Sequence, residues 1–210
     1  MNTKRKPTQL RAGFTLVEVL AVIVILGILM TLLVASIGGS GDAVRAKLTR
    51  VRLAEIGTVC EAYERRFGDF PASSFDVDAG QVPNSTNLGG EALVAALWSN
   101  GFEAGGNFRV EDLINSDFDR SLKSLSDFPE SDLFELADGW KQPIAYLRSD
   151  DYGAEHVYIL DSGSDSSGFE SRVRAVRDGA AGRYRGHGRF QLHSAGVDGE
   201  FGTEDDLIHP

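Results

Sequence analysis

The acidic end of the chain carries the residues best suited to binding a metal ion. Its carboxylates are Asp198, Glu204, Asp205 and Asp206, with glycines at 196, 199 and 202. Carboxylates crowded into one loop repel each other, whereas a hard cation with roughly six to eight oxygen ligands neutralises them and also binds backbone carbonyls. We therefore expect a structural Ca²⁺ ion here. An acidic, solvated terminus without metal is the alternative.

Glu18 is the second residue whose type and position suggest a chemical role, because it interrupts a long apolar run. An ionised carboxylate inside hydrocarbon costs roughly 2.5 kcal/mol or more, so it requires a partner or a function. Glu18 lies one helical turn from Phe14. Cleavage between Gly13 and Phe14 would create an α-amino group beside it, and in a helical assembly the amine of one copy could pair with Glu18 of its neighbour.

The apolar run that holds Glu18 predicts a membrane-spanning helix over residues 14–37. Its length reaches the roughly 20 residues that a bilayer core requires. The preceding basic residues Lys4, Arg5, Lys6 and Arg11 favour a cytoplasmic N-terminus. We expect a cleaved leader at 1–13 and an exported domain at 38–210. An ordinary signal peptide and an uncleaved signal anchor remain alternatives.

The basic leader, Gly13, Phe14, Thr15, Leu16 and Glu18 together resemble the class III signal of type IV pilins and type II secretion pseudopilins. The resemblance implies cleavage after Gly13 by a prepilin peptidase. It also implies N-methylation of Phe14 by the same peptidase/methyltransferase. Assembly into a filament would then use the N-terminal helix, with Glu18 at the contact.

Composition limits the other functions. The chain has 210 residues, a net charge of −10 and one cysteine, so nucleic acid is an unfavourable partner and Cys60 cannot form an internal disulfide. We expect Cys60 to be a small apolar residue on a helix. Neither a nucleophile elbow nor a phosphate loop nor an HExxH motif is present in the sequence, and we expect no enzymatic activity.

Apolar spacing predicts that the helix continues to Phe67, with Gly68 and Pro71 ending it. Over its amphipathic half, residues 38–67, the helix is expected to turn an apolar stripe towards a sheet. The stripe consists of Val44, Leu48, Val51, Ile56, Val59, Tyr63 and Phe67. Residues 89–101 predict a second helix, and a short helix is possible at 121–126.

The rest of the pattern predicts β-structure. Residues 144–147 and 155–160 are expected to form an antiparallel pair, and residues 189–193 a third strand. The serine-rich stretch at 161–168 is expected to be a turn, with a metal site as its less favoured alternative. The arginine-rich stretch at 169–189 is expected to be an inserted loop, solvated or in contact with an acidic neighbouring subunit.

Two later segments add to the resemblance. Asp138–Tyr146 is similar to the Asp-Pro-Trp-Gly-x-Pro-x-x-Tyr element of type II secretion major pseudopilins, with Trp140 expected in the core and Lys141 replacing a glycine, which suggests a less tight turn. The acidic tail resembles the calcium loop of the same subunit. This match implies Asp198 and Asp206 as the first ligands, Asp205 next and Glu204 last.

We expect an α+β, pilin-like fold, in which a long N-terminal helix packs on a small antiparallel sheet with a C-terminal metal-binding loop (sheet and loop at 138–210). The expected function is that of a structural subunit of a type II secretion pseudopilus. Expected partners are the prepilin peptidase, other copies of the chain, minor pseudopilins and the inner-membrane platform. A type IV pilus subunit is one alternative, and a signal-anchored, exported calcium-binding domain or hydrolase is the other.

Overall fold

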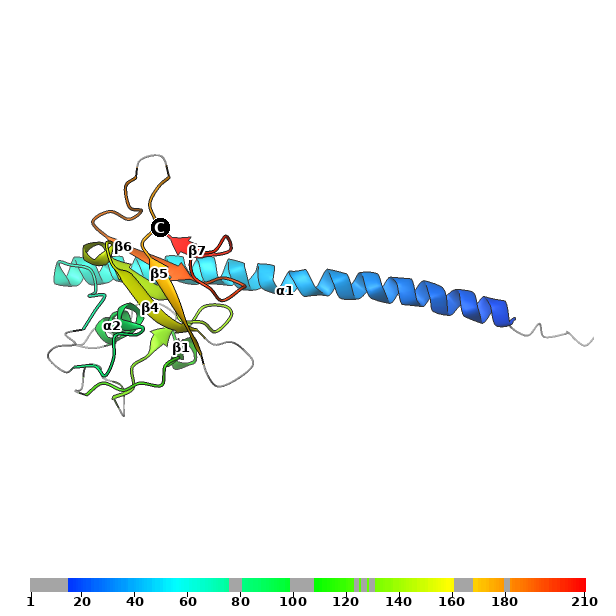
Figure 1. Ribbon diagram of the computed structural model, residues 1–210, viewed down its shortest axis with the longest axis horizontal. Helices are drawn as coiled ribbons and strands as arrows, with labels where there is room; N and C mark the ends of the chain where they lie inside the picture. The colour runs from blue at the N-terminus through cyan, green and yellow to red at the C-terminus, as the bar shows by residue number, and fades with distance from the viewer. Residues whose placement is uncertain are drawn as a thin grey trace, which may run out of the picture. The chain divides into compact units, whose positions relative to one another are not determined.

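The structure is a computed structural model that divides the chain into two compact units, residues 1–42 and residues 43–210. It describes residues 15–75, 81–98, 108–122, 125, 128, 131–160, 168–179 and 182–210, except for the side chains of residues 32–40. Helix α1 (Leu16–Phe67) contributes residues to both units. The arrangement is α+β, as expected for a pilin-like fold (Figure 1).

Helix α1 confirms the predicted helix up to Phe67. It ends because Gly68 takes a left-handed conformation (φ 86°), while the Gly68 N–H donates to the carbonyl of Glu64 at 2.7 Å. Part of the predicted membrane segment at 14–37 lies outside the described residues, namely Phe14 and the side chains of 32–37. Among the residues whose side chains the structure describes, no helix combines the length and the apolar character that crossing a membrane requires.

The buried face of α1 within residues 43–210 differs from the prediction. Leu53, Ile56 and Cys60 are buried and follow one another at helical spacing. Val44, Leu48 and Val51, which we expected against the sheet, are instead 58–60% exposed. Phe67 is also exposed, whereas Val59 is buried as expected. The prediction is confirmed for Ile56, Val59 and Tyr63, which lie in or against the core, and wrong for the other four residues of the stripe. The helix carries apolar side chains on two faces, and periodicity alone does not say which one meets the sheet.

The main sheet has three antiparallel strands in the order β3–β6–β7: β3 (Ala145–Arg148), β6 (Phe190–Ser194) and β7 (Leu207–His209). β3 and β6 confirm two predicted strands to within one residue. β7, which follows the acidic tail loop, was not predicted. Its register with β6 pairs Ser194 with Leu207.

A separate hairpin corrects two predictions. β4 (Glu155–Leu160) pairs in an antiparallel manner with β5 (Phe169–Arg174), and not with β3. Residues 169–174 are therefore a strand, not the beginning of an inserted loop. Their alternating burial places Ser171 and Val173 inward and the charged residues outward. The stretch at 161–167, predicted as a turn, lies outside the described residues.

The smaller elements complete the domain. They are α2 (Leu88–Leu97), η1 (Val110–Asp112), η3 (Ser149–Asp151) and a two-stranded sheet of β1 (Leu113–Ile114) and β2 (Glu135–Leu136). α2 matches the predicted second helix but ends earlier, since Trp98 is its C-cap. The described residues of the possible helix at 121–126, namely 121, 122 and 125, are not helical.

The core of residues 43–210 lies where α1, α2 and the main sheet meet (Figure 1). Leu53 and Ile56 of α1 pack with Leu93 of α2 and with Tyr146 and Phe190 of the sheet. Trp140 packs against this cluster and is partly buried, in agreement with its predicted core role. Cys60 is buried and free, as expected.

Candidate functional site

Glu18 caps the helix on which it lies. Its Oε2 accepts hydrogen bonds from the backbone N–H of Thr15 at 2.8 Å and from the Thr15 hydroxyl at 2.9 Å, and the Glu18 N–H donates to Thr15 Oγ1 at 3.3 Å. This reciprocal pattern is a capping box, with Thr15 as N-cap and Glu18 three residues on. Gly13 and Phe14, the predicted cleavage and methylation residues, lie outside the described residues.

The residues around Glu18 present an apolar surface. Large apolar side chains between Leu16 and Met30 are 50–82% exposed. In the unit of residues 43–210, Val44, Leu48 and Val51 form a second exposed apolar stripe along α1. Apolar surface of this extent is typical of faces that contact lipid or protein.

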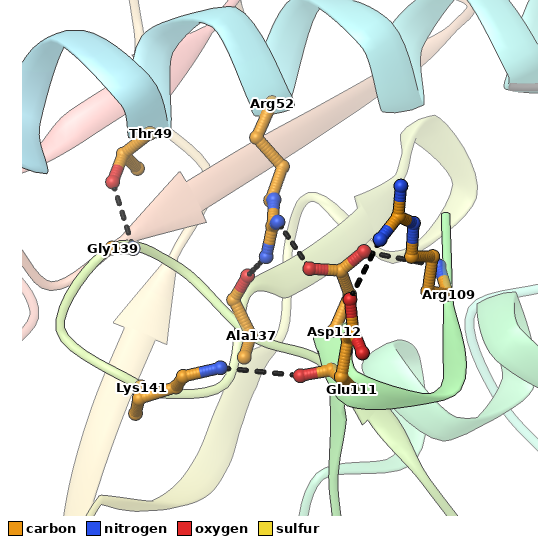
Figure 2. Close-up of polar contacts among 8 residues, drawn as sticks. All are labelled: Thr49, Arg52, Arg109, Glu111, Asp112, Ala137, Gly139 and Lys141. Carbon is orange, nitrogen blue, oxygen red and sulfur yellow. Dashed lines mark hydrogen bonds and ion pairs between the residues drawn. The ribbon is translucent and has the colours of Figure 1, made fainter. Parts of the chain in front are cut away.

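The stripe borders a polar junction between α1 and the rest of its unit. Figure 2 shows the polar contacts of this junction. Arg52 forms an ion pair with Asp112 and donates from Nη1 to the carbonyl of Ala137 at 2.7 Å. Asp112 also accepts a hydrogen bond from the Arg109 N–H at 3.0 Å. The guanidinium of Arg52 therefore connects two segments, residues 109–112 and residue 137, to the helix.

The turn after Ala137 is held against α1 in the same region (Figure 2). The Gly139 N–H donates to Thr49 Oγ1 at 2.9 Å, and Lys141 Nζ donates to the carbonyl of Glu111 at 3.1 Å. A Cβ at Gly139 would crowd the Arg45 carbonyl oxygen at 2.8 Å. Lys141 has φ 66°, so the turn keeps the left-handed conformation that favours glycine, contrary to the looser turn suggested by the sequence.

A groove of about 340 Å³ lies at this junction. Leu48, Val51 and Arg52 line it from α1, and Asp138 and Lys141 line it from the turn. It therefore combines part of the exposed apolar stripe with groups of both charges. Such a mixed surface can receive a side chain of another protein subunit.

In the C-terminal loop, Asp205 is bound by its own neighbours. Its Oδ2 accepts from the backbone N–H groups of Val197 at 2.5 Å and Asp198 at 3.1 Å, and its Oδ1 accepts from the Thr203 hydroxyl at 2.7 Å. Burial alone would raise the pKa of Asp205, but these hydrogen bonds have the larger effect, so the pKa is lowered. The Asp205 side chain therefore carries its charge in the folded loop.

Asp206 lies deeper in the same loop. Its Oδ2 accepts from the Gly202 N–H at 2.7 Å, whereas its Oδ1 is buried without a hydrogen-bond partner. Burial raises the pKa of Asp206, and the charges of Asp205 and Asp198 add to this rise. Asp198 and Glu204 are exposed. The unpartnered oxygen fits a cation ligand, although the four tail carboxylates, all of them described, do not supply three ligand atoms within 4.8 Å of one another.

The structure does form one acidic group that the sequence analysis missed. One carboxylate oxygen from each of Glu91, Asp117 and Glu135 lies within 4.8 Å of the other two, and this is the one such group among the described residues. The only local signal was Glu91, an acid inside the apolar helix α2. Asp117 and Glu135 reach it through tertiary structure, which spacing in the sequence does not reveal.

Comparison with known proteins identifies the N-terminal segment. Residues 9–34 match the family described as the prokaryotic N-terminal methylation motif. This motif indicates a type IV pilin-like or pseudopilin precursor that is processed by a prepilin peptidase and assembled into a pilus-like polymer, with a membrane-anchored N-terminus and a periplasmic domain. No curated protein and no solved structure matches the chain.

Proposed function

We propose that this chain is a structural subunit of a type II secretion pseudopilus, which drives export of proteins across the outer membrane. The observation that carries the proposal is the exposed apolar surface of α1, interrupted by Glu18 within the methylation motif. Before assembly, the chain would lie in the inner membrane with its C-terminal domain in the periplasm. Its role is structural, not catalytic.

Glu18 has two tasks in this proposal. Both hydrogen bonds from Thr15 go to Oε2, so Oε1 can accept a hydrogen bond from the α-amino group of Phe14 of a neighbouring subunit. Apolar helix packing has little directional preference, whereas a carboxylate in lipid is stabilised only by a partner. Pairing of Glu18 with the neighbour's amine would therefore set the register of the filament.

The domain of residues 43–210 would take part in the same contacts. Val44, Leu48 and Val51 lie on the face of α1 that the sheet leaves exposed. Burial of apolar surface contributes about 25 cal/mol per Å², so a stripe covered in each subunit adds up along a filament. The adjoining groove would receive side chains of the neighbour.

The C-terminal loop would hold a structural Ca²⁺ ion through Asp198, Asp206 and Asp205, with Glu204 as the last candidate. The buried, unpartnered oxygen of Asp206 supports this assignment. The chain carrying both Asp198→Asn and Asp206→Asn should bind one Ca²⁺ equivalent fewer than the native chain in equilibrium dialysis. Equal stoichiometry in the two proteins would refute the loop site.

Two features favour secretion over a type IV pilus. The Trp140 turn and the acidic tail resemble the major pseudopilin, and Cys60, the one cysteine, is buried in the core and cannot form the C-terminal disulfide more common in major pilins. The expected partners are the prepilin peptidase, other copies of the chain, minor pseudopilins and the inner-membrane platform.

Deletion of the gene in its own organism tests the proposal. We expect proteins normally found in the medium to accumulate in the periplasm, and the intact gene to restore their secretion. Normal secretion together with loss of surface pili would instead identify a type IV pilus subunit. Normal secretion and normal pili would contradict both assignments.

A further inference from the structure

Four carboxylates from three separate segments converge inside the domain of residues 43–210. Glu91 lies in the first turn of α2, Asp117 and Asp119 follow β1, and Glu135 lies on β2. The group is distant in sequence from the C-terminal loop and has no part in the function proposed above.

The spacing of these carboxylates suits one metal ion. One carboxylate oxygen from each of Glu91, Asp117 and Glu135 lies within 4.8 Å of the other two. Calcium binds oxygen at about 2.3–2.6 Å, so two ligands on opposite sides of one ion are about 5 Å apart. A single Ca²⁺ ion could therefore contact all three side chains with little movement.

The surroundings of Glu91 indicate that these carboxylates need a positive charge beside them. Glu91 is 1% exposed, yet neither of its carboxylate oxygens accepts a hydrogen bond from a donor group, and the Asp119 side chain can bond to it only by sharing a proton. Asp119 Oδ1 is buried and unpartnered as well. An unpaired, buried carboxylate is among the most costly groups in a protein interior. Three such oxygens require a positive charge, which either a proton shared between Glu91 and Asp119 or a bound cation would supply.

The other oxygens are oriented by donors. Glu135, which is fully buried, accepts from Asn87 Nδ2 at 3.0 Å and from the Ser116 N–H at 3.2 Å. Asp119 Oδ2 accepts from Asn84 Nδ2 at 2.9 Å. A carboxylate oxygen has a second lone pair, so each can keep its donor and still bind a metal. Donors that fix the ligands in this way are typical of metal sites.

A proton is the competing occupant. Burial, followed by the charges of Asp119, Glu135 and Asp117, raises the pKa of Glu91 to about 10. Burial, with the charge of Asp117, raises the pKa of Asp119 to about 7. Without a metal, Glu91 would therefore be protonated at neutral pH. A bound cation would replace that proton.

We propose that Glu91, Asp117, Asp119 and Glu135 bind a Ca²⁺ ion that ties the first turn of α2 to β2 and to the segment after β1. The donor set contains only oxygen, which favours hard cations over zinc or copper. Calcium accepts irregular, carboxylate-rich coordination, whereas Mg²⁺ requires a near-ideal octahedron and keeps several waters.

The test uses the full chain in detergent micelles, carrying Asp198→Asn and Asp206→Asn so that the tail loop does not contribute. Equilibrium dialysis against Ca²⁺ should find one bound equivalent, and chelator should lower the melting temperature. Adding Glu91→Gln should abolish binding and make the melting temperature independent of chelator. The amide has nearly the shape of the protonated acid, so the fold should survive. Asp119→Asn is the second variant if it does not.

Glu111→Gln is the matched control, because Glu111 is an exposed carboxylate in the same domain. It should keep the bound equivalent and the response to chelator. The proposal is overturned if the tail-loop background binds no Ca²⁺, or if Glu91→Gln and Asp119→Asn both bind as the background does. The four carboxylates would then be a proton-sharing group. These outcomes are independent of the secretion and pilus assays.

Discussion

Thr15 and Glu18 are joined by reciprocal hydrogen bonds at the start of α1, with the Thr15 N–H 2.8 Å from Glu18 Oε2 and the Glu18 N–H 3.3 Å from Thr15 Oγ1. The acid inside the apolar segment thus has a partner within its own chain. Its charge is not required for this cap, since glutamine at the same position can accept the Thr15 hydrogen bonds. The capping and assembly roles of Glu18 can therefore be separated by mutation.

Glu18→Gln should leave the helix intact but reduce filament assembly, because it keeps the acceptor and removes the charge that would pair with the neighbour's amine. Thr15→Val should have the opposite effects, with a weaker helix start and assembly maintained. It weakens the cap by about 1 kcal/mol and leaves the carboxylate in place. Helix content by circular dichroism and the yield of cross-linked polymer from membranes measure the two effects. Native assembly of Glu18→Gln would exclude charge pairing.

Leu48 and Leu53 lie on opposite faces of α1 and should respond differently to truncation. Leu53 is 1% exposed, so Leu53→Ala should lower the free energy of unfolding by about 2–5 kcal/mol. Leu48 is 60% exposed, and Leu48→Ala should change it by less than about 0.5 kcal/mol. Polymer yield, however, should fall for Leu48→Ala. Unimpaired assembly of this variant would remove the exposed stripe from the subunit contact.

The junction in Figure 2 predicts a difference between two arginines. Arg52→Met leaves Asp112 without its ion pair and the Ala137 carbonyl without its donor, so it should destabilise the domain by about 2–3 kcal/mol. Arg109 has a side chain that is 75% exposed, and Arg109→Met should cost less than about 0.5 kcal/mol. Thermal unfolding of both variants checks this. Equal melting temperatures would show that Arg52 does not hold the junction.

His193 predicts a loss of stability in acid. Burial, with the charge of Arg185, lowers its pKa from 6.5 to about 4. The unfolded chain therefore binds the proton more readily. This contribution to stability is fully present above about pH 6.5 and is lost as the pH falls towards 4, by about 3 kcal/mol in total.

The measurement compares the pH dependence of unfolding in the native chain and in His193→Gln. The difference between them isolates His193 from His209, whose pKa burial also lowers. We expect the variant to lose less stability between pH 6.5 and 4. Parallel curves would show that His193 does not control this range.

The sequence predicted the elements whose signals are local. The apolar spacing and the Gly68 stop gave the end of α1, and Glu155–Leu160 forms a strand with the expected bounds. The sequence analysis missed β5 because the charged residues on its outward face hide the alternation of inward and outward side chains. Arg172 and Arg174 suggested a solvated loop, but in the hairpin both pair with Glu155 on β4. Cross-strand ion pairs of this kind become visible only when the register is known.

Pairing and site formation depend on distant residues. β3 joins β6, some forty residues later, because the two strands bury Tyr146 and Leu192 in one core, and proximity in sequence wrongly favoured β4. The internal carboxylate group follows the same rule. Glu91 and Glu135 are brought together by contacts between α2 and β2 that no local pattern encodes.

The most direct test of the account is the mass of the N-terminal peptide of the protein isolated from its native membrane fraction. A pilin-like precursor that is processed as the motif indicates should begin at Phe14 and carry one additional methyl group on its amine. Glu18 of one subunit would then have the neighbour's amine as its partner. A peptide that begins at Met1, without the methyl group, would contradict processing and assembly together.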